Sequence, residues 1–219
     1  LGETVMDEIL TRKLHELASN CGADLFGVAN ANDFSEYTDK HNPYFYVDSA
    51  KSVIVIGYQI GDTVLDALIK PINGKGYVYF INEILGNIAH EIISVLLLER
   101  KKAILSPNNG IFAKDTAVLA GLGTIGKNNL LITEKFGSHT RLRTIVTDAE
   151  LCKTYGKPKY FCDNCSNLCW SACPANAFSE GRYNKGACFE YTKSHVKKLS
   201  ENAILGCREC ELACPAFAC

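Results

Sequence analysis

The sequence predicts an α/β protein, of the α+β kind, that is made of two domains. A β-branched run over 52–58 (SVIVIGY) is typical of a buried strand. The stretch 77–100 is apolar nearly all round, which predicts a long central helix. The composition changes near Asp148, where β-branched residues become rare and cysteines begin. We therefore expect an α/β domain over 1–148 and a compact cysteine-rich domain over 149–219.

Other elements follow from local patterns. Apolar residues recur at helical spacing over 3–20, which predicts an amphipathic helix. A turn is expected at 71–76 (PINGKG) because glycine and proline interrupt regular structure there. Further strands are expected at 24–29, 103–105, 130–133 and 144–147.

Bulk properties exclude several classes of function. The 219 residues are 47% hydrophobic, enough for one sizeable core and a small module. A formal charge of −1 gives no general electrostatic attraction to nucleic acid or acidic lipid. We find no apolar run of the ~18 to 20 residues that a membrane span needs. The first ten residues hold three acids and no basic residue, unlike a signal peptide. We therefore expect a cytoplasmic protein with no membrane partner.

The cysteines are unevenly spread, since ten of the eleven fall in the last third of the chain. An odd count does not suit a disulfide scaffold, and disulfide-dense domains are usually small secreted ones without a large apolar partner. CxxC pairs that precede Cys-Pro indicate a metal site instead.

Two cysteine runs carry this metal motif. The first, 162–174 (CDNCSNLCWSACP), follows the bacterial ferredoxin pattern C-x2-C-x2-C-x3-C-P with one extra residue between its second and third cysteines. The second, 207–215 (CRECELACP), echoes it, and Cys188 lies 19 residues upstream of it. A cubane needs four thiolates at tetrahedral corners, and in two-cluster ferredoxins the fourth cysteine of a run ligates the other cluster. We therefore predict two [4Fe–4S] clusters, one held by Cys162, Cys165, Cys169 and Cys214, and the other by Cys173, Cys188, Cys207 and Cys210.

Zinc is the main alternative metal, because CxxC pairs also bind it. The remaining cysteines, Cys21, Cys152 and Cys219, are expected to lie outside the clusters. Trp170 lies inside the first run and is expected to shield its cluster from water, which tunes the reduction potential.

A glycine-rich stretch fills 120–129 (AGLGTIGKNN). Glycines at this density let a backbone approach a bulky flat or phosphate-bearing ligand, but the residues alone favour a glycine-rich surface turn. The stretch also fits G-x-G-x-x-G. No strong strand precedes it and no βαβ unit frames it, so we do not predict a dinucleotide site.

These motifs together resemble the epoxyqueuosine reductase family, cobalamin-dependent iron–sulfur enzymes related to reductive dehalogenases. The resemblance is carried by 120–133 (AGLGTIGKNNLLIT), 147–151 (TDAEL) and the two cysteine runs, and it extends over roughly 12–215. Shorter matching segments are 22–28 (GADLFGV), 50–56 (AKSVIVI), 186–191 (GACFEY) and 206–210 (GCREC).

The resemblance implies a nitroreductase-like α/β domain that holds a corrinoid, and a ferredoxin-like module with two clusters that passes electrons to cobalt. It assigns corrinoid binding to Gly121, Gly123, Gly126, Lys127 and Asn128. Flavin in place of the corrinoid is a weaker option.

The chain departs from the family pattern in two places. Epoxyqueuosine reductases place an acidic proton donor shortly before the segment that matches 111–114, whereas 106–110 reads SPNNG here, and Asp115 follows that segment. An epoxide-opening reaction needs a placed acid. The chain also lacks the helical C-terminal extension and the basic stretch that would hold tRNA, so tRNA is not expected as a partner.

The sequence thus predicts an enzyme, an iron–sulfur oxidoreductase that reduces a corrinoid and through it an unknown substrate, with its catalytic residues unassigned. We expect a ferredoxin or flavodoxin-like electron donor. The alternative is a non-catalytic electron carrier, or a reductive activator for a partner corrinoid protein.

Overall fold

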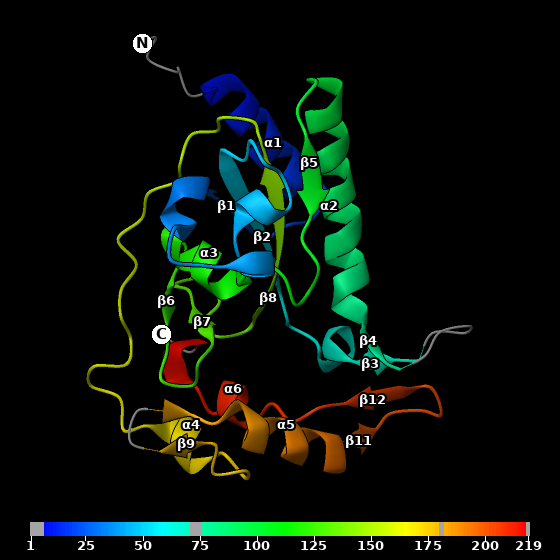
Figure 1. The fold of residues 1–219 in the computed structure, drawn as a ribbon. Helices are drawn as coiled ribbons and strands as arrows, with labels where there is room; N and C mark the ends of the chain where they lie inside the picture. The colour runs from blue at the N-terminus through cyan, green and yellow to red at the C-terminus, as the bar shows by residue number, and fades with distance from the viewer. Residues whose placement is uncertain (1–6, 71–75, 180–181, 218–219) are drawn as a thin grey trace. The chain divides into compact units, whose positions relative to one another are not determined.

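The computed structural model describes residues 7–70, 76–179 and 182–217, and it shows a mixed α/β fold with small sheets (Figure 1). The chain divides into two compact units. The first comprises Leu1–Tyr58, Ile84–Leu122 and Arg141–Pro158, and the second comprises Gln59–Glu83, Gly123–Thr140 and Lys159–Cys219. The predicted domain boundary at residue 148 falls inside the first unit. The cysteine-rich segment shares its unit with two segments that precede it by many residues.

A four-stranded sheet forms the centre of the first unit. Its strand order is β1-β2-β8-β5. β1 and β2 are antiparallel, with Val28 opposite Ile54, and β5 is antiparallel to β8. The strands predicted at 24–29, 52–58, 103–105 and 144–147 are confirmed. Their bounds are β1 Leu25–Asn30, β2 Ser52–Gln59, β5 Ala103–Leu105 and β8 Thr140–Thr147.

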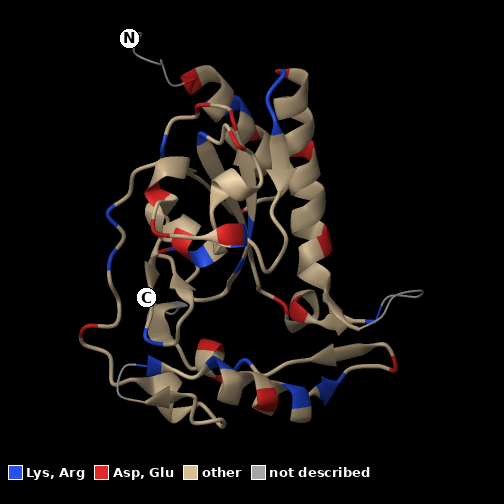
Figure 2. Ribbon diagram, in the orientation of Figure 1, with Lys and Arg blue, Asp and Glu red and all other residues tan. Residues whose placement is uncertain are grey.

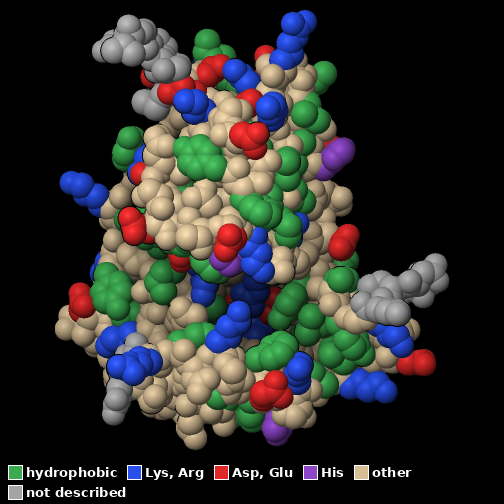
Figure 3. Space-filling model, viewed as in Figure 1, with side chains coloured by type: hydrophobic (Ala, Val, Ile, Leu, Met, Phe, Trp, Pro, Cys, Tyr) green, Lys and Arg blue, Asp and Glu red, His purple; other side chains and the backbone are tan. Residues whose placement is uncertain are grey.

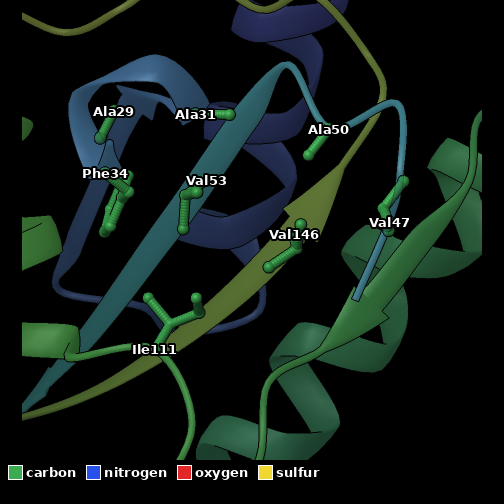
Figure 4. Packing of buried hydrophobic residues seen from close by; sticks show 8 residues of the cluster. All are labelled: Ala29, Ala31, Phe34, Val47, Ala50, Val53, Ile111 and Val146. Carbon is green, nitrogen blue, oxygen red and sulfur yellow. The ribbon is translucent and has the colours of Figure 1, made fainter. Parts of the chain in front are cut away.

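The core of this unit shows why the β-branched run is so apolar. Residues 53–56 of β2 are fully buried, so apolar side chains on both faces of the strand lose contact with water. Figure 4 shows part of this core, in which β-strand residues pack against the loops that follow β1 and precede α3. The cluster consists of Ala29, Ala31, Phe34, Val47, Ala50, Val53, Ile111 and Val146.

Helix α1, Glu8–Asn20, packs on β1 through an apolar stripe. Leu10, Leu14 and Ala18 recur four residues apart and are buried. The carboxylate of Asp7 caps the helix by accepting a hydrogen bond from the Leu10 amide at 2.8 Å. Residues 3–6 of the predicted helix lie outside the described residues. The unit also contains α3 Ala113–Leu119 and the 3-10 turns η1 Ala31–Phe34, η2 Asp39–His41 and η3 Pro43–Phe45.

Helix α2, Phe80–Leu98, is the long helix that the sequence predicts at 77–100. It starts later because Val78 and Tyr79 pair with β3 instead. By length and composition alone α2 is apolar enough to cross a membrane, a test that core helices of soluble proteins also pass. Ile81, Leu85 and Ile92 are fully buried, whereas Leu97 and Leu98 near its end are exposed. Figure 3 shows hydrophobic side chains along the edge where α2 lies.

The second unit is built from short elements. Its largest sheet has the order β11-β12-β3-β4 and joins 197–205 to 68–79. The strand predicted at 130–133 is present as β7, which pairs with β6, and most of the turn predicted at 71–76 lies outside the described residues. Helix α5 carries one acidic residue, Glu190, between the basic residues Lys185 and Lys193 (Figure 2). The elements are η4 Thr63–Asp66, β3 Leu68–Ile69, β4 Val78–Tyr79, β6 Thr124–Ile125, β7 Leu131–Ile132, α4 Leu168–Ser171, β9 Phe178–Ser179, β10 Arg182–Tyr183, α5 Lys185–Ser194, β11 Lys197–Lys198, β12 Ala203–Leu205, α6 Glu209–Leu212 and η5 Pro215–Phe217.

Candidate functional site

Three short helices carry or flank the eight predicted cluster cysteines. Cys169 lies in α4, Cys188 in α5 and Cys210 in α6, and α4 packs against α6. The other five stand in the loops next to these helices. Cys162, Cys169 and Cys173 are buried, and the remaining five are partly buried. All eight belong to the second unit.

The first set of sulfurs combines both runs. Burial raises the pKa of the Cys169 thiol, and the nearby charges of Cys214, Cys162 and Cys165 raise it further. Cys214 also lies beside Cys162 in an apolar cluster with Ile132. Cys214 is the penultimate residue of the second run, so the structure brings it to three cysteines of the first run.

The second set is the complement of the first. Burial raises the pKa of Cys210 to about 12, and the charges of Cys173, Cys188 and Cys207 add to the rise. The pKa of Cys207 is also raised, mainly by burial and in part by the charges of Cys188 and Cys173. The last cysteine of the first run thus lies with the first two of the second run. We refer to these groups as the 162 set and the 173 set.

Both sets have the chemistry that an iron–sulfur cluster requires. Thiolates are soft ligands, and peptide N–H groups aimed at sulfur stabilise their negative charge. The Lys127 amide lies 3.4 Å from Cys162 Sγ, and the Ala177 amide lies 3.4 Å from Cys173 Sγ. Among residues 7–70, 76–179 and 182–217, no group of three or more His, Cys, Asp or Glu side chains is placed to hold a single metal ion. The ligand assignment stays a prediction.

The predicted corrinoid residues fall in two groups. Gly121 has a φ of +71°, and on the side where a Cβ would project it meets the backbone of Gly156. A Cβ at Gly123 would meet the backbone of Ile132, and a Cβ at Gly126 would meet the Ile132 side chain. Close approach of the chain to itself therefore accounts for these three glycines, and their role toward a corrinoid stays a prediction.

Lys127 and Asn128 contact the cysteine runs. The Lys127 carbonyl accepts a hydrogen bond from Trp170 Nε1 at 2.9 Å, and its Nζ donates to Asn167 Oδ1 at 2.9 Å. Asn128 is 3% exposed and donates through Nδ2 to the Cys210 carbonyl at 3.4 Å. The 127–128 dipeptide therefore contacts the loop of the first run and the helix of the second. The sequence gives no signal for these pairings.

A buried ion pair supports the second run. Arg208 donates through Nε and Nη2 to both carboxylate oxygens of Glu211, at 3.1 and 2.9 Å, and lies 3.4 Å from Asp66 Oδ2. The three side chains are between 3% and 9% exposed. Because Arg208 and Glu211 flank Cys210, this network fixes the loop that carries Cys207 and Cys210.

The three other cysteines lie apart from the sets or cannot be placed. Cys21 is exposed at the end of α1. Cys152 belongs to the first unit, where its amide donates to Thr11 Oγ1 at 2.9 Å. Cys219 lies outside the described residues.

The first unit contains a cavity of about 440 Å³ beside 106–115. Asn108, Lys114, Asp115 and Arg143 contribute to its wall, and Arg143 donates to Asn108 Oδ1. Although 106–110 has no acid, Asp115 thus supplies a carboxylate to this cavity.

Tyr37 is the partner of that carboxylate. Its hydroxyl donates to Asp115 Oδ2 at 2.8 Å. Burial, followed by the hydrogen bond and the charge of Asp115, raises the pKa of Tyr37 to about 12. The hydroxyl therefore keeps its proton at neutral pH and holds the carboxylate in place.

No protein-family model matches the chain. Among curated proteins, an epoxyqueuosine reductase of Leadbetterella byssophila is 31% identical over 199 residues, which are 84% of this chain and 64% of that protein. A tetrachloroethene reductive dehalogenase of Desulfitobacterium hafniense is 31% identical over 178 residues, 76% of this chain and 29% of the relative. The chain therefore spans less than two thirds of the length of these relatives.

Solved structures show the same fold. An epoxyqueuosine reductase with an epoxyqueuosine-modified tRNA-Tyr stem loop has a TM-score of 0.73 at 18% identity, covering 96% of this chain and 66% of that one. A reductive dehalogenase described in terms of B12-dependent dehalogenation has a TM-score of 0.71 at 17% identity, covering 98% of this chain and 33% of that one.

Proposed function

The chain belongs to the family of the epoxyqueuosine reductases and reductive dehalogenases, and we propose that it is an iron–sulfur oxidoreductase that passes low-potential electrons through two [4Fe–4S] clusters to a corrinoid. The observation that carries the proposal is the sorting of eight cysteines into the 162 set and the 173 set, each drawn from both runs. Bound clusters supply one-electron transfer at potentials that the surrounding protein sets.

The roles of this chain's own residues follow from the contacts. The 162 set and the 173 set would each hold one cluster. Lys127, through its amide, and Asn128, through its side chain, would fix the geometry of the two sets relative to each other within the unit. Trp170, locked by its indole to the Lys127 carbonyl, would keep water from the first run.

The corrinoid rests on the family to which the chain belongs. The cavity of the first unit, about 440 Å³, has the volume of a pocket for a smaller ligand, and the five predicted corrinoid residues are not part of its wall. A corrinoid supplies cobalt redox chemistry when bound. The predicted contacts are Gly121, Gly123, Gly126, Lys127 and Asn128, to which the resemblance to the family assigns the corrinoid.

A proton shared in a hydrogen bond between the Tyr37 hydroxyl and the Asp115 carboxylate lies at the wall of this cavity. The substrate needs a proton when a bond to oxygen or halogen is cleaved reductively. Tyr37 holds the Asp115 carboxylate at the wall of the cavity, so we propose that the Asp115–Tyr37 pair handles that proton. A tRNA substrate is compatible with the family, because an epoxyqueuosine reductase of the same fold was solved with a tRNA-Tyr stem loop.

Reconstitution tests the corrinoid. The protein is incubated under reducing conditions with cobalamin or with flavin, passed over a gel-filtration column and examined by its visible spectrum. We expect cobalamin to be retained at about one per chain. Lys127→Ala, at a predicted contact, should reduce retention, whereas Leu98→Trp, at an 82% exposed position, should not. If neither cofactor co-elutes, the chain is an electron carrier instead.

A further inference from the structure

Helix α5 carries a predicted cluster ligand, Cys188, and presents lysines and an aromatic ring to solvent. No residue of α5 is buried, although the structure describes the whole helix. We propose that the outer surface of α5, with the neighbouring strand β11, is the docking site for a small acidic protein that donates electrons to the cluster of the 173 set. This docking site rests on the proposed function and deepens it, because it names the class of partner and the place where electrons enter.

Three exposed side chains form a stripe along α5. Lys185, Phe189 and Lys193 are four residues apart, and helical residues at this spacing share a face, with Cβ atoms about 5–6 Å apart. The Lys193 ammonium lies 4.4 Å from the centroid of the Phe189 ring, so these two side chains lie together. Phe189 is 55% exposed, and aromatic residues are enriched at the centres of protein interfaces. We refer to these three residues as the α5 stripe.

The charge around the α5 stripe is predominantly positive. Residues 182–198 hold five basic residues and one acidic residue, whereas the whole chain has a formal charge of −1. All five are exposed, and they are Arg182, Lys185, Lys193, Lys197 and Lys198. Figure 2 shows basic residues on both α5 and β11. The acidic residue, Glu190, lies 3.7 Å from Lys193, but an ion pair this exposed is weak. The positive field therefore attracts an acidic protein.

The position of Cys188 identifies the partner as an electron donor. Cys188 directly precedes Phe189 on the same helix and is partly buried. A protein on the α5 stripe is thus separated from this predicted ligand by no more than the width of one helix, about 10–12 Å. One electron passes from the reduced centre of the donor to the cluster, so the donor is oxidised, the cluster is reduced, and no bond is made or broken.

Apolar surface next to the lysines favours a protein partner over a nucleic acid. Val196 and Leu199, on either side of β11, are each 41% exposed, in addition to Phe189. A hollow of about 550 Å³ also borders α5, and its wall includes Ala187 and Lys193. A protein gains free energy by covering apolar side chains, whereas the phosphates of RNA gain nothing from them.

Binding to two acidic probes, a flavodoxin and a [2Fe–2S] ferredoxin, tests the docking site without relying on turnover. Fluorescence anisotropy of each labelled, oxidised probe gives a dissociation constant at low and at high salt. Lys185→Gln with Lys193→Gln removes two charges from the α5 stripe. Lys40→Gln with Lys51→Gln, at exposed positions of the first unit, is the matched control. We expect the stripe variant to bind a probe about tenfold more weakly at low salt, and the control to bind like the wild type.

Phe189→Ala separates the apolar contact from the charges. Charges steer association, whereas buried contacts determine how long a complex lasts. We therefore expect this variant to release the probe faster and to keep the salt dependence of the wild type. Because Phe189 is 55% exposed, its loss should leave the thermal midpoint unchanged.

Stopped-flow reduction tests the entry of electrons. When reduced flavodoxin is mixed with the oxidised protein, the EPR signal of the 173 set should appear before that of the 162 set. The Lys185→Gln with Lys193→Gln variant should slow the first step about tenfold at low salt. Dithionite, which needs no docking site, should reduce both proteins to the same extent.

Several results would overturn the docking site. Neither probe binds, or the stripe variant and the control bind equally well, or an unrelated RNA stem loop binds the α5 stripe while both proteins do not. Iron and sulfide are measured in every sample. Protein without iron and sulfide would contradict the proposed clusters, and the binding measurement would still decide whether an acidic protein docks on α5.

Discussion

At the scale of single residues, the most specific feature of the site is that each predicted ligand set combines cysteines from both runs. Cys214→Ala should remove the same EPR signal as Cys162→Ala, and Cys173→Ala should remove the same signal as Cys207→Ala. The reason is that Cys214 lies with Cys162, Cys165 and Cys169 in one set.

The matched control for this series is Cys21→Ala, because Cys21 is exposed at the end of α1 and belongs to neither set. It should leave both signals intact. Loss of the Cys207 and Cys210 signal on substitution of Cys214 would show that the ligand sets are assigned wrongly.

Tyr37 gives a prediction about alkaline stability. Its pKa is raised to about 12 in the folded protein, whereas an unfolded tyrosine titrates near 10. The unfolded state therefore loses this proton first as pH rises. The contribution of Tyr37 is complete below about pH 10 and is lost between about pH 10 and 12.

Denaturant unfolding at a series of pH values measures this contribution. Tyr37→Phe should flatten the loss of stability in that window, and Tyr155→Phe should not change it. An unchanged alkaline profile in Tyr37→Phe would mean that the Tyr37–Asp115 hydrogen bond is not maintained in solution.

The residues of the site were predictable to different degrees. The cysteines follow a local spacing, so a short pattern identifies all eight. The contacts of Lys127 and Asn128 join positions 35 to 82 residues apart, and no local pattern specifies such pairings. In sequence, Asp115 follows the 111–114 segment, whereas the family places its acid before that segment. The helix that begins at Ala113 nevertheless brings Asp115 to the wall of the cavity that Asn108 also lines.

At the scale of elements, the start of α1 rests on one side chain. Asp7 caps the helix through its bond to the Leu10 amide. Asp7→Ala should cost about 1 kcal/mol in the free energy of unfolding, because the Leu10 amide in the first turn loses its acceptor. Thermal or urea unfolding measures this.

Asp7→Asn is the conservative comparison, since asparagine caps a helix nearly as well as aspartate. It should retain most of the stability. Equal losses in both variants would show that charge, and not the cap, is the property that matters at Asp7.

The α6 element depends on the buried Arg208 network. Arg208→Met removes the guanidinium between Asp66 and Glu211, which are 4% and 3% exposed. Removing one partner of a buried ion pair costs about 3 to 5 kcal/mol. Urea unfolding should show a loss of that size, and Arg208→Lys should lose less. Full stability in Arg208→Met would exclude this network as a support of the second run.

Long periodic elements were predictable and short ones were not. The strands at 52–58 and 103–105 and the helix near 80–98 follow from apolar runs and helical spacing. α4 and α6 are single turns of four residues, too short to show a period. They are held by packing of one against the other, which a sequence window does not contain. The helix expected from residue 77 starts at Phe80 because strand pairing competes for Val78 and Tyr79.

At the scale of the whole molecule, each unit is built from segments that are far apart in the sequence. The cysteine-rich unit takes in 59–83 and 123–140, and the sheet β11-β12-β3-β4 joins two of its segments. The glycine-rich stretch is divided between the units, with Gly121 in the first and 123–129 in the second. The change in amino-acid composition near residue 148 marks where the cysteines begin. It does not indicate that two earlier segments of the chain belong to the cysteine-rich unit.

The central claim is that this chain holds two [4Fe–4S] clusters, and the most direct test is metal and sulfide analysis of protein purified without oxygen. The two sets of four thiols predict about eight iron atoms and eight sulfides per chain. Zinc in place of iron, with little or no sulfide, would contradict the account.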